Sequence, residues 1–96
     1  MKSVGYSKRS DKDTTAIEGY LAYQFTQKEI DNFYKLLERF EEIIVHFPEL
    51  YPVSTKKFKI RRAVLSKQLS VFYRVFEHKI SVVAVLDNRM DPAKWP

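Results

Sequence analysis

The chain has 96 residues, of which 45% are hydrophobic and 30% are charged, and its formal net charge at pH 7 is +5. This length and composition predict one folded domain over residues 1–96 and exclude a disordered or low-complexity chain. The lack of cysteine excludes disulfides and thiolate metal sites. No apolar run fits a signal peptide or a membrane span, so we expect a cytoplasmic protein with no membrane partner.

The positive charge is concentrated in the second part of the sequence. Residues 1–55 contain 7 Lys and Arg against 9 Asp and Glu, whereas residues 56–96 contain 10 against 3. A basic part beside a mildly acidic part favours one functional face that meets nucleic acid or an acidic protein segment. The alternative is an ordinary solvated surface.

Two helices are predicted in the first half, after a short strand over residues 3–6. Ser10 followed by Asp13 has the spacing of a capping box and predicts a first helix from about Ser10 to Tyr23. Thr26 followed by Glu29 predicts a second helix, whose apolar residues repeat at spacings of three and four until Pro48. The short joint makes them a helical hairpin over about residues 10–47.

The second half has the period of strands. We expect a loop over residues 48–55, a first strand from Lys56, a second over 69–77 and a third over 80–86, so that an antiparallel meander covers about residues 56–87 and a tail covers 88–96. The order strand, helix, helix, strand, strand, strand predicts an α+β fold with the helical hairpin packed on one face of an antiparallel sheet.

Cationic side chains alternate along the first strand of this meander. Lys57, Lys59 and Arg61 are expected to lie in a row on one face, about 7 Å apart, which suits the phosphates of a nucleic acid. Arg74 on the next strand and Arg89 after the last one are expected to extend this surface. The alternative is an edge strand whose lysines prevent aggregation.

Few residues in the sequence suggest general acid-base chemistry. His78 falls in a predicted hairpin turn and His46 near a helix end, where exposed histidines are common. Asp87 and Asp91 flank Arg89 without forming a recognisable metal site, so we expect no metal and no cofactor. Trp95 can stack on a base or pack on the sheet.

Several motifs, in this order and spacing, resemble the RelE/ParE superfamily of bacterial type II toxins over nearly the whole chain. They are Tyr6-Ser7-Lys8-Arg9 before the hairpin, Phe47-Pro48 at its end, the strands Ile60-Arg61-Arg62-Ala63-Val64 and Val71-Phe72-Tyr73-Arg74-Val75, and Val85-Leu86-Asp87-Asn88-Arg89-Met90-Asp91-Pro92. The resemblance implies a toxin that a cognate antitoxin neutralises by covering its basic face. RelE-like members cut mRNA on the ribosome without metal, whereas ParE-like members inhibit DNA gyrase and are not nucleases.

On the RelE side the resemblance implies Lys59, Arg61 and Arg89 as catalytic residues, and Lys57, Arg62, Arg74 and Trp95 as residues that bind nucleic acid or the antitoxin. Ser70 stands where these nucleases commonly have an arginine, and only Trp95 can replace their tail tyrosine. Because the strand is so basic, a ribosome-dependent mRNA endonuclease is the leading expectation. The alternatives are a ParE-like gyrase inhibitor and a degenerate toxin that acts only as a binding module.

Overall fold

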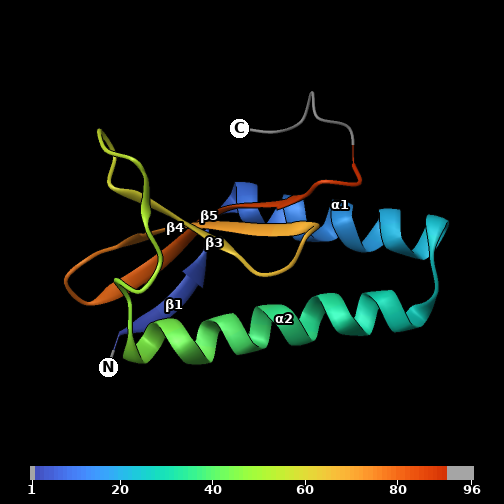
Figure 1. The fold of residues 1–96 in the computed structure, drawn as a ribbon, viewed down its shortest axis with the longest axis horizontal. Coiled ribbons are helices and arrows are strands. Elements are labelled where there is room, and N and C mark those ends of the chain that lie inside the picture. The colour runs from blue at the N-terminus through green and yellow to red at the C-terminus, as the bar shows by residue number, and fades with distance from the viewer. Residues whose placement is uncertain (1, 91–96) are drawn as a thin grey trace.

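The computed structural model describes residues 2–90 and contains two helices and five strands. The elements are β1 (Ser3–Tyr6), α1 (Lys8–Gln24), α2 (Gln27–His46), β2 (Val53–Thr55), β3 (Ile60–Val64), β4 (Leu69–Val75) and β5 (Lys79–Asp87). Both helices run along the long axis of the molecule, and their connection lies at the opposite end from the β4–β5 turn (Figure 1). The predicted α+β fold is confirmed. Among the described residues, neither helix has the length and apolarity needed to cross a membrane.

The first helix begins earlier than predicted. Ser7 is the N-cap, and its hydroxyl accepts a hydrogen bond from the backbone N–H of Ser10 at 3.1 Å. Ser10, which the spacing predicted as the cap, is instead fully buried inside the helix. A serine three residues before another serine offers two possible caps, and burial decides between them.

The second helix is amphipathic, as its sequence predicts. Phe33, Leu37, Phe40 and Ile44 are buried, and the helix ends at His46 just before Pro48. Thr26 is the N-cap, but its side chain makes no capping hydrogen bond, so the predicted capping box does not form. The helix is therefore stabilised mainly by the packing of its apolar stripe against the core.

The sheet has the strand order β1-β5-β4-β3-β2, and β3, β4 and β5 form the predicted antiparallel meander. β1 pairs with β5 in parallel, from Ser3 opposite Lys79 to Tyr6 opposite Val82. The segment predicted as a loop before the meander contains an additional edge strand, β2, which pairs antiparallel with β3. The meander itself starts at Ile60 rather than Lys56.

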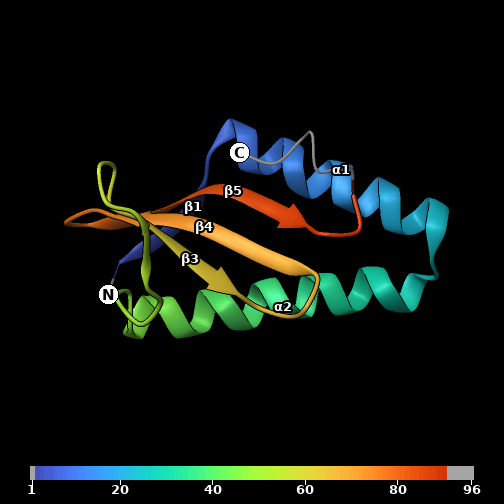
Figure 2. The ribbon, with the colours of Figure 1, turned by 45° about the horizontal axis from the view of Figure 1, so that its top comes forward.

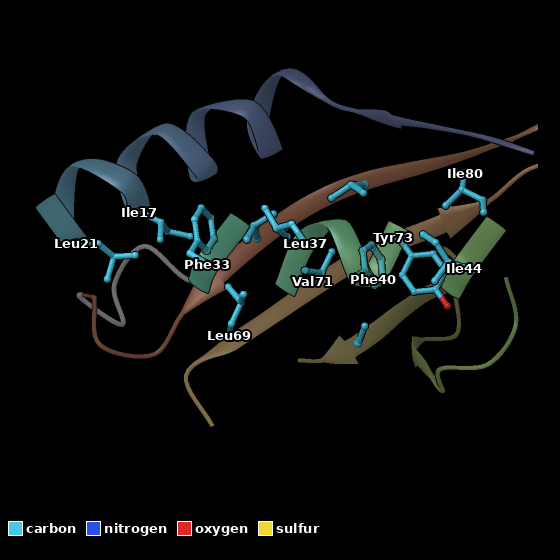
Figure 3. Close-up of a cluster of buried hydrophobic side chains, with 13 residues drawn as sticks. Ile17, Leu21, Phe33, Leu37, Phe40, Ile44, Leu69, Val71, Tyr73 and Ile80 are labelled. Carbon is cyan, nitrogen blue, oxygen red and sulfur yellow. The ribbon is translucent and has the colours of Figure 1, made fainter. Parts of the chain in front are cut away.

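One face of the sheet carries the hydrophobic core. Figure 3 shows buried side chains from α1, α2 and the sheet meeting between the layers. A bulge between β4 and β5 places Phe72 opposite Ala84 and Tyr73 opposite Val82. The residue of β5 between Val82 and Ala84 therefore has no partner in β4. Because of this extra residue, side chains on both sides of the bulge reach the same face of the sheet, which explains the almost unbroken apolar run of β5. The cluster contains Ile17, Leu21, Phe33, Leu37, Phe40, Ile44, Ala63, Leu69, Val71, Tyr73, Ile80, Val82 and Val85.

The first turns of α1 cover the edge of β5 beyond the end of β1. The Ser7 backbone N–H and the Ser10 hydroxyl both donate to the carbonyl oxygen of Val82, each at 3.0 Å. The Asp13 carboxylate accepts a hydrogen bond from the backbone N–H of Val85 at 3.0 Å. Polar side chains of a helix thus satisfy backbone groups that a further strand would otherwise bind.

Candidate binding groove on the open face of the sheet

The face of the sheet away from the core contains a groove of about 560 Å³. Among the described residues that line it there are two arginines and no carboxylate or histidine. The groove extends from the N-terminal turn of α1 across β5, β4 and β3 to β2. Its lining residues are Arg9, Ser54, Thr55, Ile60, Arg62, Phe72, Val83 and Ala84.

Arg62 and Phe72 lie opposite each other on neighbouring strands of this face. The Arg62 guanidinium lies over the Phe72 ring, 5.6 Å from its centroid, and its Nη2 donates to the hydroxyl of Ser70 at 3.3 Å. A cation over a phenyl ring keeps its charge while the ring limits its freedom. The guanidinium of Arg62 therefore lies beside Ser70, where the family resemblance expects an arginine.

Arg9 supplies the second positive charge, from the N-terminal turn of α1. Its guanidinium lies 3.7 Å from the carboxylate of Asp13, and about half of its side chain is exposed. Because Asp13 also accepts the Val85 N–H, the same carboxylate fixes α1 to the edge of the sheet and orients Arg9. A surface pair at this distance leaves the arginine free to bind another anion.

The predicted cationic row along one strand is wrong. Lys57 and Lys59 lie in a turn before β3, and Lys59 has a φ of 53°, in the left-handed region. Only Arg61 is in a strand, opposite Tyr73 of β4. A left-handed residue breaks the alternation of side chains that the row requires.

Arg61 lies on the core side of the sheet, and it binds the loop after α2. Its Nη1 donates to the carbonyl oxygens of Glu49 at 3.2 Å and Tyr51 at 2.7 Å. The Tyr73 hydroxyl donates to the carbonyl oxygen of Pro48 at 2.8 Å in the same loop. Burial of the Tyr73 phenol raises its pKa above the ordinary value. Arg61 therefore holds the segment that leads into β2.

Arg89 forms an ion pair at the other end of the sheet. Its Nη2 lies 2.6 Å from Oδ2 of Asp87 and its Nε 2.9 Å from Oδ1, while Glu29 lies 3.5 Å away and the Phe25 ring 4.9 Å. The hydrogen bond with Asp87 raises the pKa of Arg89, although burial opposes this. The Tyr20 hydroxyl also donates to the Arg89 carbonyl oxygen at 3.0 Å. Arg89 thus joins the end of β5 to both helices.

The three residues predicted as catalytic do not converge. Arg61 lies opposite Tyr73, whereas Asp87, the partner of Arg89, lies opposite Leu69. Four residues along β4 correspond to about 13 Å. Lys59 lies in the turn before β3 and joins neither group. These three side chains therefore do not form one site.

The remaining predicted residues have different positions. Arg62 and Arg74 lie on the open face, since they alternate with core residues. Trp95 lies outside the described residues. His46 is exposed at the end of α2, and His78 lies 3.8 Å from Glu77 in the β4–β5 turn. Neither histidine lines the groove.

Sequence reasoning missed Arg9 and Phe72 as groove residues, together with the hydroxyls of Ser54 and Thr55. Arg9 and Phe72 could have been predicted, because they belong to motifs that carry the family resemblance. Ser54 and Thr55 had no such signal, since they were assigned to a loop. Their position becomes clear only when β2 pairs with β3.

Two solved structures resemble this chain over nearly its whole length. A chain of the chromosomal ParDE TA system from P. aeruginosa covers 91% of this chain and 96% of its own length, with 15% identity and a TM-score of 0.62. A chain of the E. coli DinJ-YafQ toxin-antitoxin complex covers 99% and 98%, with 13% identity and a TM-score of 0.55. The chain has the RelE/ParE fold. No protein-family model and no curated protein matches the sequence.

The expected RelE/ParE fold is therefore confirmed at the level of architecture. In this chain the helical hairpin covers one face of the sheet (Figure 2). The residues that line the groove, Arg9 and Arg62 among them, lie on the other face. Identities of 13% and 15% show a shared fold, but they do not show a shared mechanism. The mechanism has to be inferred from the side chains of this chain.

Proposed function

We propose that this chain is the toxin of a type II toxin-antitoxin pair and that it acts by binding a target protein through the groove. The observation that carries the proposal is the composition of the groove. Two arginines and the Phe72 ring line it, and its described lining residues include no histidine or carboxylate. Cationic and aromatic side chains suit the recognition of an acidic protein surface.

RNA cleavage requires more than these residues offer. A metal-independent nuclease needs a group that accepts or donates a proton beside the reacting phosphate. Lys59, Arg61 and Arg89, the residues predicted for catalysis, are separated, and the guanidinium groups of Arg61 and Arg89 already have protein partners. The basic row that favoured cleavage is also missing. These points favour ParE-like inhibition of DNA gyrase over cutting of mRNA.

Ribosome-dependent mRNA cleavage is the second candidate. The observation in its favour is the position of Arg62, whose Nη2 lies 3.3 Å from the hydroxyl of Ser70. A guanidinium at this place can stabilise the charge of a phosphate in the transition state. The cleavage mechanism then needs a proton donor from outside the groove.

A cognate antitoxin is the partner expected in both cases. The groove has two cationic side chains and an apolar floor, so an antitoxin segment with acidic and apolar side chains fits it. An extended segment that orders on binding can cover the width of the sheet. Such a segment would prevent the target from reaching Arg9 and Arg62.

The proposal is tested by inducing the chain in bacteria with and without the antitoxin encoded beside it. We expect growth arrest, altered plasmid supercoiling and DNA-damage signalling, with mRNA intact at the time growth stops. Arg62→Gln should relieve the arrest, and Lys12→Gln, on the exposed side of α1, serves as the control of equal charge. Cleaved mRNA ends before any change in supercoiling would support the second candidate. Unimpaired growth would refute the toxin proposal.

A further inference from the structure

Two consecutive residues of β2 that carry hydroxyl groups, Ser54 and Thr55, line the same groove. In a regular strand, neighbouring side chains point to opposite faces. Val53 of β2 lies opposite Arg61 of β3. Two residues later, Thr55 lies opposite Ile60, so β2 has one residue more than β3 at this point. Such a bulge lets two neighbouring side chains reach one face, which explains why both hydroxyl residues line the groove.

β2 is an accessible part of the sheet. It is the last strand in the sheet order, so only one of its edges is paired within the described chain. It has three residues, and residues 52–59 are all exposed. A short edge strand with few buried contacts opens more readily than the core strands. This segment can therefore enter the active-site cleft of another enzyme in an extended conformation.

Other hydroxyl groups of the chain lack one or both of these properties. Thr15 is exposed, but it belongs to α1, and its hydroxyl donates to the carbonyl oxygen of Asp11 at 3.0 Å. Ser10 and Ser70 are buried. An enzyme that takes an extended segment would first have to unfold a turn of α1 to reach Thr15. Exposure and an extended backbone occur together in β2.

Arg62 is the charge that a phosphoryl group on β2 would meet. The carbonyl oxygen of Pro52 accepts a hydrogen bond from the Arg62 backbone N–H at 3.0 Å, so β2 lies directly beside this arginine. About 7 Å along the strand and about 4.8 Å across it separate the Cα atoms of Thr55 and Arg62 by about 8 Å. An arginine and a phosphorylated side chain together span that distance. The described contacts of the guanidinium, with the Phe72 ring and the Ser70 hydroxyl, are neutral.

We propose that Ser54 and Thr55 form a phosphorylation site for a serine/threonine protein kinase, and that the phosphate pairs with Arg62 inside the groove. The kinase transfers the γ-phosphoryl group of ATP to the hydroxyl oxygen. The new bond joins that oxygen to phosphorus, the bond from phosphorus to the β–γ bridging oxygen breaks, ADP leaves, and the hydroxyl proton passes to a base of the kinase. The phosphate carries a charge of about −1.5 to −2 at pH 7 and suits charge-assisted hydrogen bonds to an arginine.

The turn after β2 indicates which kind of kinase fits. Lys56, Lys57 and Lys59 are exposed in this turn, directly after the two hydroxyl groups. The Lys59 backbone N–H donates to the carbonyl oxygen of Lys56 at 3.3 Å. A substrate cleft lined with carboxylates complements three cations at this place. We therefore expect a kinase with an acidic substrate cleft.

The consequence for activity rests on the proposed function, in which the groove binds an acidic protein surface. Arg9 and Arg62 are the cations that line the groove in the described chain. A phosphate on β2 occupies Arg62 and offsets most of the combined charge of the two arginines, since it carries about −1.5 to −2. Arg9 contacts Asp13 beside β5, and β4 and β3 lie between β5 and β2, so the phosphate acts on Arg9 only at long range. Phosphorylation is thus expected to switch off target binding.

The pairing is tested by phosphorus NMR on chains that carry phosphoserine at position 54 or, separately, at position 55, introduced through an expanded genetic code. The second pKa of the phosphate is ordinarily about 6. A cation within about 4–6 Å favours the dianion, so we expect the pKa to be lower by about one unit. The described residues that line the groove include no carboxylate or histidine that titrates in this range.

Matched variants identify the partner of the phosphate. Arg62→Gln should return the pKa toward its ordinary value, Arg9→Gln should change it less, and Lys12→Gln, with the same charge change on the exposed side of α1, should not change it. Phosphoserine in place of Thr15 should titrate at the ordinary value. Circular dichroism checks that each chain is folded. An ordinary pKa at both β2 positions, or a lowered pKa that persists in Arg62→Gln, would overturn the proposal.

Access to the site is tested by incubating the full chain with ATP and a serine/threonine kinase that has an acidic substrate cleft. Mass spectrometry should find the phosphate on Ser54 or Thr55 and not on Thr15. Phosphate on Thr15 with none on β2 would overturn the accessibility of the strand, as would a chain that takes up no phosphate.

Growth arrest tests the consequence separately. Ser54→Glu, which adds a negative charge, should arrest growth less than Ser54→Gln, which has nearly the same shape without the charge. Equal arrest by the two variants would overturn the switch. Unimpaired growth with the wild-type chain would refute the proposed function instead, and the phosphorus NMR titration decides on the pairing with Arg62 in either case.

Discussion

Replacement of Arg89 by methionine distinguishes a structural arginine from a catalytic one. The Asp87 side chain is 1% exposed, and the Arg89 side chain supplies two of the hydrogen bonds to it, at 2.9 Å and 2.6 Å. In Arg89→Met this carboxylate keeps the backbone N–H of residue 89 as a partner but loses the cation. Removing one partner of a buried pair costs about 3–5 kcal/mol. Because a quarter of the Arg89 side chain is exposed, we expect about 3 kcal/mol, the lower end of that range.

Urea unfolding followed by circular dichroism measures this loss, since a domain of this size usually unfolds in one transition. Asp87→Asn alone should also destabilise the fold. The double variant should lose less than the sum of the two single losses, with a coupling of about 1–3 kcal/mol. A loss below about 1 kcal/mol for Arg89→Met, together with abolished growth arrest, would refute the structural role and restore Arg89 as a catalytic candidate.

Three further predictions concern the elements that hold the groove in place. Arg61→Leu should destabilise the fold by about 1–3 kcal/mol in urea unfolding, because the carbonyls of Glu49 and Tyr51 lose a charged donor. Arg61→Lys should recover part of this loss. Unchanged stability would contradict the role of Arg61 in holding the loop after α2. Ser7→Ala should cost about 1 kcal/mol, and Thr26→Ala clearly less, since only Ser7 makes a capping bond with its side chain. Burial and the hydrogen bond to Glu41 raise the pKa of Tyr6, so stability should be full below pH 10 and fall above it, as the unfolded phenol ionises first. Tyr6→Phe should reduce this decline by up to about 1.4 kcal/mol per pH unit in urea titrations above pH 10, and an identical decline in both proteins would argue against it.

The helical hairpin could be predicted because its signal is local. Phe33, Leu37, Phe40 and Ile44 repeat with the period of a helix, and burying that stripe is the main source of the stability of the helix. The α1 start was misplaced because Ser7 and Ser10 are equally good caps in sequence, and only the contact of Ser10 with Val82 shows which one lies inside.

The strand before residue 60 was mispredicted for a different reason. Lys57, Phe58 and Lys59 alternate between charged and apolar residues, but alternation indicates a strand only when one set is buried. Phe58 is 49% exposed, so no face of this segment packs on the core. A turn and an unpaired strand have the same pattern in such a segment.

The sequence predicts that Arg61 and Arg62 lie on opposite faces of the sheet, but it does not predict which of the two faces is open. Neighbouring residues of a strand lie on opposite faces, and Arg61 and Arg62 do so in β3. Which side is open depends on where the helices pack, and that depends on the pairing of distant strands. The predicted catalytic arginine was therefore the one turned toward the core side, and Arg62 became the groove residue.

The pairing of β1 with β5 has a consequence for the synthesis of this chain. The first strand made pairs with the last one, with Ser3 opposite Lys79, and β5 also supplies Val83 and Ala84 to the groove. A nascent chain that ends before residue 79 therefore lacks both the partner of β1 and one wall of the groove. Long-range pairing of this kind forms late in folding. The groove is thus complete only once β5 has been synthesised, and products that terminate before β5 should be inert.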